Sequence, residues 1–474
     1  MEDEASVCKV FTKLPPELWD NIISSGTPNL SRQLCKPLSL VSHSFRDFFQ
    51  PLLFSSINLF IPARANNPDF LRCLEFLQAP RILNAIRRCT VRAIGPDFAE
   101  SELLRHEGIG LILERVTAIE FISVIFGDSE RDVFLRLKRV REIKLQGCSC
   151  SLFFTKKHLT RYPSPPAGSK LPLLNIQRIQ SERSWNSRVL AYWLSLTSSD
   201  ALQHISVTEG HNSDVHPSFK KTQYRNVKEI TTDTFRDWTR FGELIACCPS
   251  ITTLRITTAP RNKAPQPWKI PLLRYYSGTS TVQAIEAVVL PNPSLVHIQL
   301  EKCNCFQMYR ALAALTNSKG HRRGVQSISL KMVDMLTVNN PFELFKEFED
   351  LRAVEVSVSD AKPDDRKACV TALLKLLEQP TQRLPKTLEF LAFQISARLP
   401  SSNGVTPTEW NELTDILGRV FWTQTHPFLS RIYVFDWDSE HGPSVRDAYD
   451  VRRGKWLGKS GHYETWEGWV REAM

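Results

Sequence analysis

Two pairs of closely spaced cysteines could hold a metal ion. They are Cys148-Ser-Cys150 and Cys303-Asn-Cys305, and thiolates are soft ligands that suit zinc. Structural zinc sites place two to four residues between paired cysteines, whereas a single residue separates each pair here. Cys148 and Cys303 each come at the end of a predicted strand, where a side chain turns into the core. We therefore predict buried thiols in the core and no metal or other cofactor.

Other residues with possible catalytic chemistry lack the context that such chemistry needs. Gly458-Lys-Ser460 is similar to the end of a phosphate-binding loop, but that loop needs glycine where this chain has Arg453. No His-Glu-x-x-His or Gly-x-Ser-x-Gly motif is present. His204 and His297 fall at outward-pointing positions of predicted strands, which favours contact with solvent or a partner over catalysis. The sequence predicts a protein that is not an enzyme.

Composition narrows the class of protein and its expected compartment. The 474 residues are 42% hydrophobic, enough for a large core, and no apolar run approaches the length of about 20 residues that crosses a bilayer. The acidic start gives no secretion signal, and eleven cysteines predict reduced thiols, so we expect the cytoplasm, the nucleus or both. The net charge of +10 favours acidic partners.

Local signals make residues 11–57 a unit of short helices. A helix is predicted to begin at Leu14-Pro-Pro-Glu, because proline suits the first helical turn and the apolar residues that follow share one face. Ser42 can cap a later helix that carries Phe45 and that we expect to end at Pro51. Such short helices cannot bury all of their large apolar side chains among themselves, so we expect a partner protein to cover part of this surface.

From residue 60 onward, segments of the form apolar-x-x-apolar-x-apolar recur at irregular intervals between helical stretches, which predicts a series of strands. Full matches begin at Ile86, Val116, Val140, Leu202, Ile251, Leu295, Val325, Leu351, Leu388 and Leu429. Weaker matches begin at Leu173 and Val227. Amphipathic helices precede several matches; Trp238, Phe241 and Leu244, for example, share one face of such a helix.

Residues 11–57 resemble an F-box, particularly the variant common in fungi. The resemblance rests on Leu14-Pro-Pro-Glu-Leu-Trp-Asp-Asn-Ile-Ile23, Leu38-Ser-Leu-Val-Ser-His-Ser-Phe-Arg-Asp-Phe48 and Pro51-Leu-Leu-Phe-Ser-Ser-Ile57. The remainder resembles F-box proteins with leucine-rich repeats in architecture only. The fold class implied is an α/β repeat, with a short all-helical F-box followed by an irregular leucine-rich-repeat solenoid. The predicted domains are the F-box at 11–57, the solenoid at 60–448 and a basic and aromatic tail at 449–474.

The resemblance implies a function as the substrate-recognition subunit of an SCF-type (Skp-cullin-F-box) ubiquitin ligase. The F-box would bind a Skp-family adaptor, and through it a cullin, while the rest of the chain would hold the substrate. Carried over position by position, the adaptor-binding residues are Leu14, Pro15, Leu18, Ile22, Val41, Phe45 and Leu53. Phe45 stands where tryptophan is common in F-boxes, which bears on the affinity for the adaptor.

Insertions rich in basic residues are the candidate substrate-binding elements. Their residues are Lys156, Lys157, Arg161, Lys170, Arg261, Lys263, Lys269 and Arg274. An acidic or phosphorylated protein would gain charge-assisted hydrogen bonds there, although solvated loops would have the same composition. Two other functions stay open, a scaffold that binds the adaptor without ubiquitination and a basic protein that binds nucleic acid. The second is the least favoured, because the longest basic cluster, Lys156 to Tyr162, is short.

Overall fold

The structure is a computed structural model. The chain forms two compact units, Met1–Thr222 and Gln223–Met474. We call them unit 1 and unit 2. The structure describes residues 36, 39–40, 43–62, 67–93, 106–126, 134, 136–150, 174–182, 188–207, 222–234, 238–259, 266–332, 341–361, 374–377, 380–397, 415–420, 422–429, 431–438, 442–456 and 470. None of the helices within these ranges is long and apolar enough to cross a membrane.

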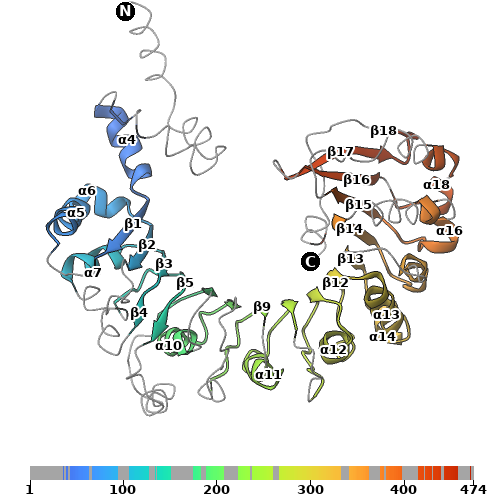
Figure 1. Cartoon of the computed structure of the whole chain (residues 1–474), viewed down its shortest axis with the longest axis horizontal. Helices are drawn as coiled ribbons and strands as arrows, with labels where there is room; N and C mark the ends of the chain where they lie inside the picture. Colours follow the sequence, from blue (N-terminus) through green and yellow to red (C-terminus); the bar gives the residue numbers. More distant parts are fainter. Residues whose placement is uncertain are drawn as a thin grey trace, which may run out of the picture. The chain divides into compact units, whose positions relative to one another are not determined.

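Unit 1 is built on a parallel sheet whose strands are neighbours in chain order (Figure 1). They are β1 (Ser56–Ile61), β2 (Arg88–Ala93), β3 (Ala118–Ile122), β5 (Glu142–Gln146), β7 (Arg178–Glu182) and β8 (His204–Val207). The short strands β4 (Ile125–Phe126) and β6 (Ser149–Cys150) form a second parallel pair. The helices are α4 (His43–Leu53), α5 (Pro68–Gln78), α6 (Pro80–Ala85), α7 (Glu107–Leu113) and α10 (Arg188–Leu196).

Unit 2 continues the same plan and ends in an antiparallel edge. Its parallel strands are β9 (Glu229–Thr234), β10 (Thr253–Thr258), β11 (Tyr275–Thr279), β12 (His297–Cys303), β13 (Ser327–Met332), β14 (Ala353–Ala361), β15 (Phe390–Ala397) and β16 (Arg431–Asp438). Strands β17 (Gly442–Asp450) and β18 (Lys455–Trp456) then pair antiparallel.

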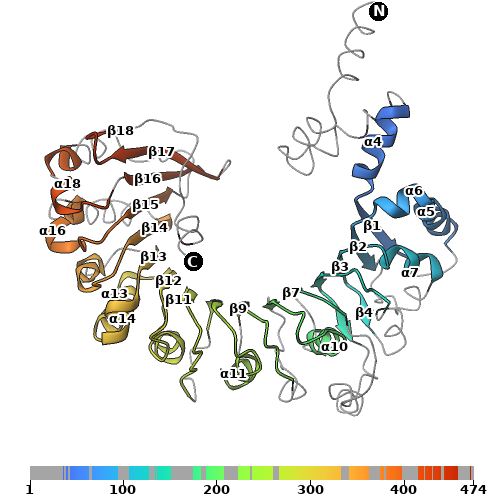
Figure 2. The same cartoon turned by 180° about the vertical axis from the view of Figure 1, so that it is seen from behind.

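The crossovers of unit 2 differ greatly in the helix that each contains. They hold α11 (Trp238–Ala246), α12 (Val282–Ala284) with the π-helix η4 (Ile285–Val289), α13 (Cys305–Thr316), α14 (Lys319–Gly324), the 3-10 helix η5 (Pro341–Glu347), α16 (Pro380–Arg383) and α18 (Trp422–Thr425). Within each unit the labelled helices lie on one side of the sheet, except for α4, which lies beyond the edge strand β1 (Figures 1 and 2). We call this side of the sheet the inner face and the opposite side the outer face.

Alternation along each strand sends apolar side chains to the inner face. In β10 Leu254 and Ile256 are buried while Thr253 and Arg255, on the other side, are partly exposed. Because side chains of a strand alternate with a period of two, the pattern apolar-x-x-apolar-x-apolar places its last two apolar residues on the same face. All ten full matches continue into a strand, so these strand predictions are confirmed. Burial of Trp238, Phe241 and Leu244 likewise confirms the amphipathic helix there.

Strand β11 was not predicted, and Gly278 explains why. The stretch Leu273-x-x-Tyr276-x-Gly278 carries glycine at the third position of the pattern. A Cβ atom at residue 278 would lie 2.0 Å from the carbonyl oxygen of Ile256 on β10. Only glycine lets the two parallel strands approach this closely, so the position that should announce the strand is necessarily not a larger apolar residue.

The predicted fold class is wrong. The described residues form an α/β fold dominated by a mostly parallel sheet, with short helices in the crossovers, and not an all-helical F-box followed by an irregular leucine-rich-repeat solenoid. The sequence pattern predicts only a strand with one apolar face, because side chains alternate along a strand, and this feature is not specific to leucine-rich repeats. The helices in the crossovers of unit 2 differ in length and type, and its last strands are antiparallel. In unit 1, helix α4 leads directly into β1. The predicted domain boundaries stay predictions.

Candidate binding surface

The outer face of unit 2 combines polar residues with aromatic residues. The strand registers align its residues in two rows that cross the sheet. The first row is Thr253, Tyr275, His297, Ser327, Ala353, Phe390 and Arg431. The second row is Arg255, Ser277, Gln299, Ser329, Glu355, Ala392 and Tyr433. Polar side chains therefore occupy the middle of this face, with aromatic side chains on both sides of them.

Hydrogen bonds join the polar residues of these rows between neighbouring strands. The Tyr275 hydroxyl donates to Gln299 Oε1 at 2.7 Å. His297 Nδ1 and Ser327 Oγ lie 2.8 Å apart. The Ser329 hydroxyl donates to Glu355 Oε2 at 2.6 Å. Each bond joins adjacent strands, so the outer face is a cross-linked polar layer.

Most of this polar layer is shielded from solvent, and Glu355 is partly exposed. The exposed fraction is 2% for His297 and 0% for both Ser327 and Ser329. Burial is the main cause that lowers the pKa of His297 to about 4, and the positive charge of Arg274 lowers it further. The imidazole is therefore neutral at pH 7, and a neutral ring both donates and accepts a hydrogen bond. We expected His297 to contact either solvent or a partner. Its burial shows that the expectation of contact with solvent was wrong.

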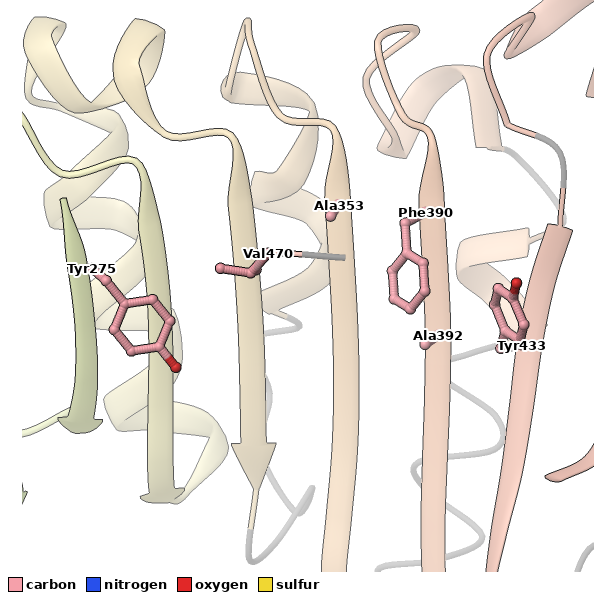
Figure 3. Packing of buried hydrophobic residues seen from close by; sticks show 6 residues of the cluster. All are labelled: Tyr275, Ala353, Phe390, Ala392, Tyr433 and Val470. Atoms are coloured by element: carbon pink, nitrogen blue, oxygen red, sulfur yellow. The ribbon is translucent and has the colours of Figure 1, made fainter. Parts of the chain in front are cut away.

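Val470 packs over this face from the far end of the sequence. Its exposed fraction is 2%, and it shares one buried cluster with Tyr275, Ala353, Phe390, Ala392 and Tyr433 (Figure 3). The rings of Phe390 and Tyr433 stack with centroids 5.3 Å apart. We call this arrangement the Val470 cluster. The small residues Ser327, Ser329, Ala353 and Ala392 lie between larger neighbours in the rows, which leaves room for one aliphatic side chain above them.

The outer face of unit 1 has a different character, because its charged residues are partly exposed. Lys144 Nζ lies 3.2 Å from Glu120 Oε1 and 3.4 Å from Glu182 Oε1. Arg178 and Glu142 form a longer pair at 3.6 Å. Surface ion pairs of this kind contribute little to stability. The outer face of unit 2 has similar ion pairs, Arg255 with Glu229 and Lys331 with Glu301, but it also carries the buried row residues His297, Ser327 and Ser329.

The predicted substrate-binding residues divide into two groups. Lys156, Lys157, Arg161, Lys170, Arg261 and Lys263 lie outside the described residues. Lys269 and Arg274 are both exposed and lie just before β11. The backbone of Arg274 is fixed, since its N–H donates to the Thr252 carbonyl and its own carbonyl accepts from Val296 and His297. The structure thus places one predicted basic residue beside the polar layer.

The predicted adaptor-binding residues lie mostly outside the described part of the chain. Leu14, Pro15, Leu18, Ile22 and Val41 are in the undescribed segments. Phe45 belongs to helix α4, although its side chain is not described, and Leu53 is half-buried at the end of this helix. Leu40, three residues before the start of α4 at His43, is 74% exposed.

Helix α4 is attached to the sheet of unit 1 without a linker. Phe49 of this helix is fully buried, and the Phe54 ring packs edge-on against Phe76 of α5 at 5.5 Å. The Ser55 carbonyl accepts from the backbone N–H groups of Arg87 and Arg88, which starts the pairing of β1 with β2. The direction of the helix is therefore fixed relative to the sheet.

The cysteines that were considered as metal ligands behave as core residues where they are described. Cys148 is fully buried, its thiol lies 3.3 Å from the Phe121 carbonyl oxygen, and burial raises its pKa to about 11. The side chains of Cys150, Cys303 and Cys305 are not described. Within the described residues no group of three or more His, Cys, Asp or Glu side chains could hold a metal ion. The core role of Cys148 is confirmed.

No protein-family model and no curated protein matched this chain when it was compared with them.

The Val470 cluster and the polar layer were not predicted from the sequence. Individually, the outer positions of β11 to β15 are ordinary strand residues, and their hydrogen bonds appear only once the registers are known. One signal was available, because Tyr275, Phe390 and Ala392 are apolar at positions where a water-facing strand would carry polar side chains.

Proposed function

We propose that this chain is the substrate-recognition subunit of an SCF-type ubiquitin ligase. In this proposal residues 11–57, which resemble an F-box in sequence, bind a Skp-family adaptor and through it a cullin. The sheets hold the protein substrate, and the chain has no catalytic role. A cytoplasmic or nuclear location belongs to the same proposal.

The rigid junction between α4 and β1 is the observation that carries the proposal. A substrate receptor must hold its substrate at a fixed position relative to the adaptor, because the ubiquitin that is transferred has to reach a lysine of the substrate. The burial of Phe49 and the contact of Phe54 with Phe76 fix α4 on unit 1. A partner bound to the segment that contains α4 would therefore keep a defined orientation to the sheet of unit 1.

The exposed basic residues Lys269 and Arg274 support an acidic or phosphorylated substrate. Both precede β11, and Arg274 has a fixed backbone. An arginine guanidinium forms bidentate hydrogen bonds with carboxylates and phosphates. Binding through these residues should weaken as salt screens the charges.

The test is co-purification of the full-length tagged chain from cells, followed by mass spectrometry of the adaptor and the cullin. The amount of adaptor that co-purifies should be at least about tenfold lower for the double variant Leu14→Ala with Pro15→Ala than for the parent chain. The reason is that truncating a central apolar anchor typically costs about 2 kcal/mol of binding free energy. The matched control is Pro271→Ala with Leu272→Ala, which changes the same residue types where Leu272 is 52% exposed in unit 2.

Each outcome of this test has a separate meaning. The proposal is supported if the parent chain and the control recover both adaptor and cullin while the Leu14 and Pro15 variant recovers neither. Recovery of the adaptor without the cullin indicates a scaffold that does not ubiquitinate. Recovery of neither subunit with the parent chain overturns the proposal. Equal thermal unfolding of the three proteins shows that the variants stay folded.

A further inference from the structure

We propose that the basic segments which lead into the strands of unit 1 bind an acidic, extended segment of the substrate through arginine–carboxylate pairs. The naming of the partner as substrate rests on the proposed function. The binding of an acidic polypeptide does not, because it follows from the charges and hydrogen bonds of unit 1.

These segments lie side by side, because the strands that follow them are parallel neighbours (Figure 1). Backbone bonds connect each segment to the next, since Thr117 donates to the carbonyl of Arg87, Arg141 to that of Thr117 and Gln177 to that of Arg141. Neighbouring strands are about 4.8 Å apart, so the segments that lead into β2, β3, β5 and β7 span about 14 Å. We call residues 84–88, 114–118, 136–142 and 174–178 the basic rim.

Positive charge dominates the basic rim. Its charged residues are the basic Arg87, Arg88, Arg115, Arg136, Lys138, Arg139, Arg141 and Arg178 and the acidic Glu114 and Glu142, an excess of six positive charges. The basic residues are exposed, except that Arg141 is partly exposed. Glu142 pairs with Arg178 at 3.6 Å, and Asp200 is exposed in the turn before β8. Like charges held this close repel one another, and an acidic partner would remove this repulsion.

Two arginines of the basic rim are held in place by the ends of their own segments. Arg87 Nη1 donates to the carbonyls of Asn84 and Ile86 at 2.6 and 3.1 Å. Arg141 Nη1 donates to the corresponding carbonyls of its own segment at 3.2 and 3.4 Å. No hydrogen bond among the described residues uses Nε or Nη2 of either side chain. These guanidinium groups are therefore ordered, and two of their nitrogens point to further use as donors.

Unit 2 shows what an arginine at this position can bind. Arg352 leads into β14 as Arg87 leads into β2, and its backbone N–H donates to the carbonyl of the preceding segment in the same way. Its Nε lies 2.8 Å from Glu389 Oε1 and its Nη2 lies 2.9 Å from Glu389 Oε2. Glu389 comes from the next segment, because its N–H donates to the Arg352 carbonyl. A carboxylate thus binds this arginine through two hydrogen bonds.

Unit 1 lacks such a carboxylate at the equivalent positions. Thr117 and Gln177 follow Arg87 and Arg141 in the next segments as Glu389 follows Arg352, and both are neutral. Within the described residues neither Arg87 nor Arg141 forms an ion pair. The two-bond geometry that Glu389 occupies in unit 2 therefore suits a carboxylate of a partner in unit 1.

The size and composition of the basic rim favour a polypeptide over a nucleic acid. A span of about 14 Å corresponds to about four residues of an extended chain. Proteins that bind single-stranded nucleic acid place aromatic side chains among the basic ones, so that bases can stack on them. The residues of the basic rim include no Phe, Tyr or Trp.

The experiment measures binding of a fluorescein-labelled peptide of about six glutamates to the full-length protein by fluorescence anisotropy. The parent chain should bind this peptide at low salt, and the affinity should fall as salt screens the exposed charges. A labelled single strand of oligothymidine with a similar net charge is the second probe. It should bind more weakly than the peptide.

The decisive variant is Thr117→Glu with Gln177→Glu, because it supplies from the next segment the carboxylates that Arg352 receives from Glu389. It keeps every basic residue of the basic rim. The added carboxylates should nevertheless occupy the two ordered arginines and weaken peptide binding at least about fivefold.

A second variant and a control have the same change in net charge. Arg115→Gln with Arg139→Gln removes two cations of the basic rim and should also weaken peptide binding at least about fivefold. The control is Arg72→Gln with Arg92→Gln, on α5 and near the carboxyl end of β2. The control should bind the peptide as the parent chain does. A variant that loses its native near-UV circular dichroism is set aside, and the other rim variant decides.

Four results would overturn the inference. The first is a parent chain that does not bind the peptide at low salt, and the second is equal binding by the parent and the folded rim variants. The third is an equal loss of binding in the control, which would show an effect of net charge alone. The fourth is tighter binding of oligothymidine than of the peptide, which would assign the basic rim to nucleic acid. No adaptor is present in this titration, so its failure leaves the co-purification result untouched, and a failed co-purification removes only the naming of the partner as substrate.

Discussion

Acid should destabilise unit 2 through His297, and the substitution His297→Gln should remove this part of the pH dependence. In the folded protein, burial and the charge of Arg274 lower the pKa of His297 from 6.5 to about 4. Between these two values the unfolded chain binds a proton that the folded chain does not. Stability therefore rises with pH in this window, so it is fully present above about 6.5 and is lost as the pH falls toward about 4.

The size of the effect follows from the width of the window. Each pH unit corresponds to about 1.36 kcal/mol, so a fall from the unfolded pKa of 6.5 to pH 5 should cost about 2 kcal/mol through His297. Burial also lowers the pKa values of His321 and His426, which act in the same direction. The contribution of His297 is therefore the difference in the pH dependence of unfolding free energy between the parent and the His297→Gln chain.

The assay is urea unfolding followed by tryptophan fluorescence at pH 7.5 and pH 5. The loss of unfolding free energy between these two pH values should be smaller by about 2 kcal/mol in the His297→Gln chain than in the parent. The Ser327→Ala chain is the control, because it removes the partner of His297 Nδ1 but keeps the imidazole. It should retain most of the pH dependence. The same loss in the parent and in His297→Gln would refute the reasoning.

Two further predictions concern the close approach of strands and the cysteines. Gly278→Ala should destabilise the protein by about 3 kcal/mol in urea unfolding, because its Cβ would lie 2.0 Å from the Ile256 carbonyl oxygen, whereas Gly418→Ala, with nothing within 4 Å, should be neutral or stabilising. A destabilisation below about 0.5 kcal/mol for Gly278→Ala would contradict the packing argument. Removing divalent metal with a chelator should leave the melting temperature unchanged, as expected of the buried, protonated thiol of Cys148, and a fall of several degrees would contradict it.

Local patterns predicted strands well where a strand buries a single apolar face. The match beginning at Val140 continues into β5, whose Ile143 and Leu145 are both buried. The weaker match beginning at Leu173 was placed three residues too early, because the residues actually buried are Ile176, Ile179 and Ser181. A buried serine gives no apolar signal, so the sequence alone could not fix this register.

The predicted end of α4 at Pro51 was wrong by two residues. The helix continues to Leu53 with Pro51 inside it, and the next backbone bond, from Phe54 N–H to the Gln50 carbonyl, is present at 3.1 Å. Proline removes a single N–H donor from a helix, and burial of Phe49 holds the preceding turn in place. Tertiary contacts thus outweighed the local stop signal.

The candidate surface could not be predicted, because it depends on contacts between distant residues. Its polar pairs join residues 24, 30 and 26 positions apart, and Val470 comes from the far end of the sequence. Composition had directed attention to basic insertions instead. Of those residues Lys269 and Arg274 are described, and Arg274 lies next to His297, whose pKa its charge lowers.

The outer faces of the two units differ in how far their polar residues are buried. In unit 1, Glu120, Lys144 and Glu182 meet as partly exposed charges, which water can solvate whatever their neighbours are. In unit 2 the middle of the outer face carries the buried neutral residues His297, Gln299 and Ser327, whose side-chain hydrogen bonds lie between adjacent strands. A buried polar group without a partner costs about 1 to 3 kcal/mol, whereas an exposed one costs nothing. Partners are therefore required for the buried polar groups of unit 2, whereas water can take their place for exposed groups. The pairs therefore satisfy polar groups on a face that Val470 contacts through an apolar side chain.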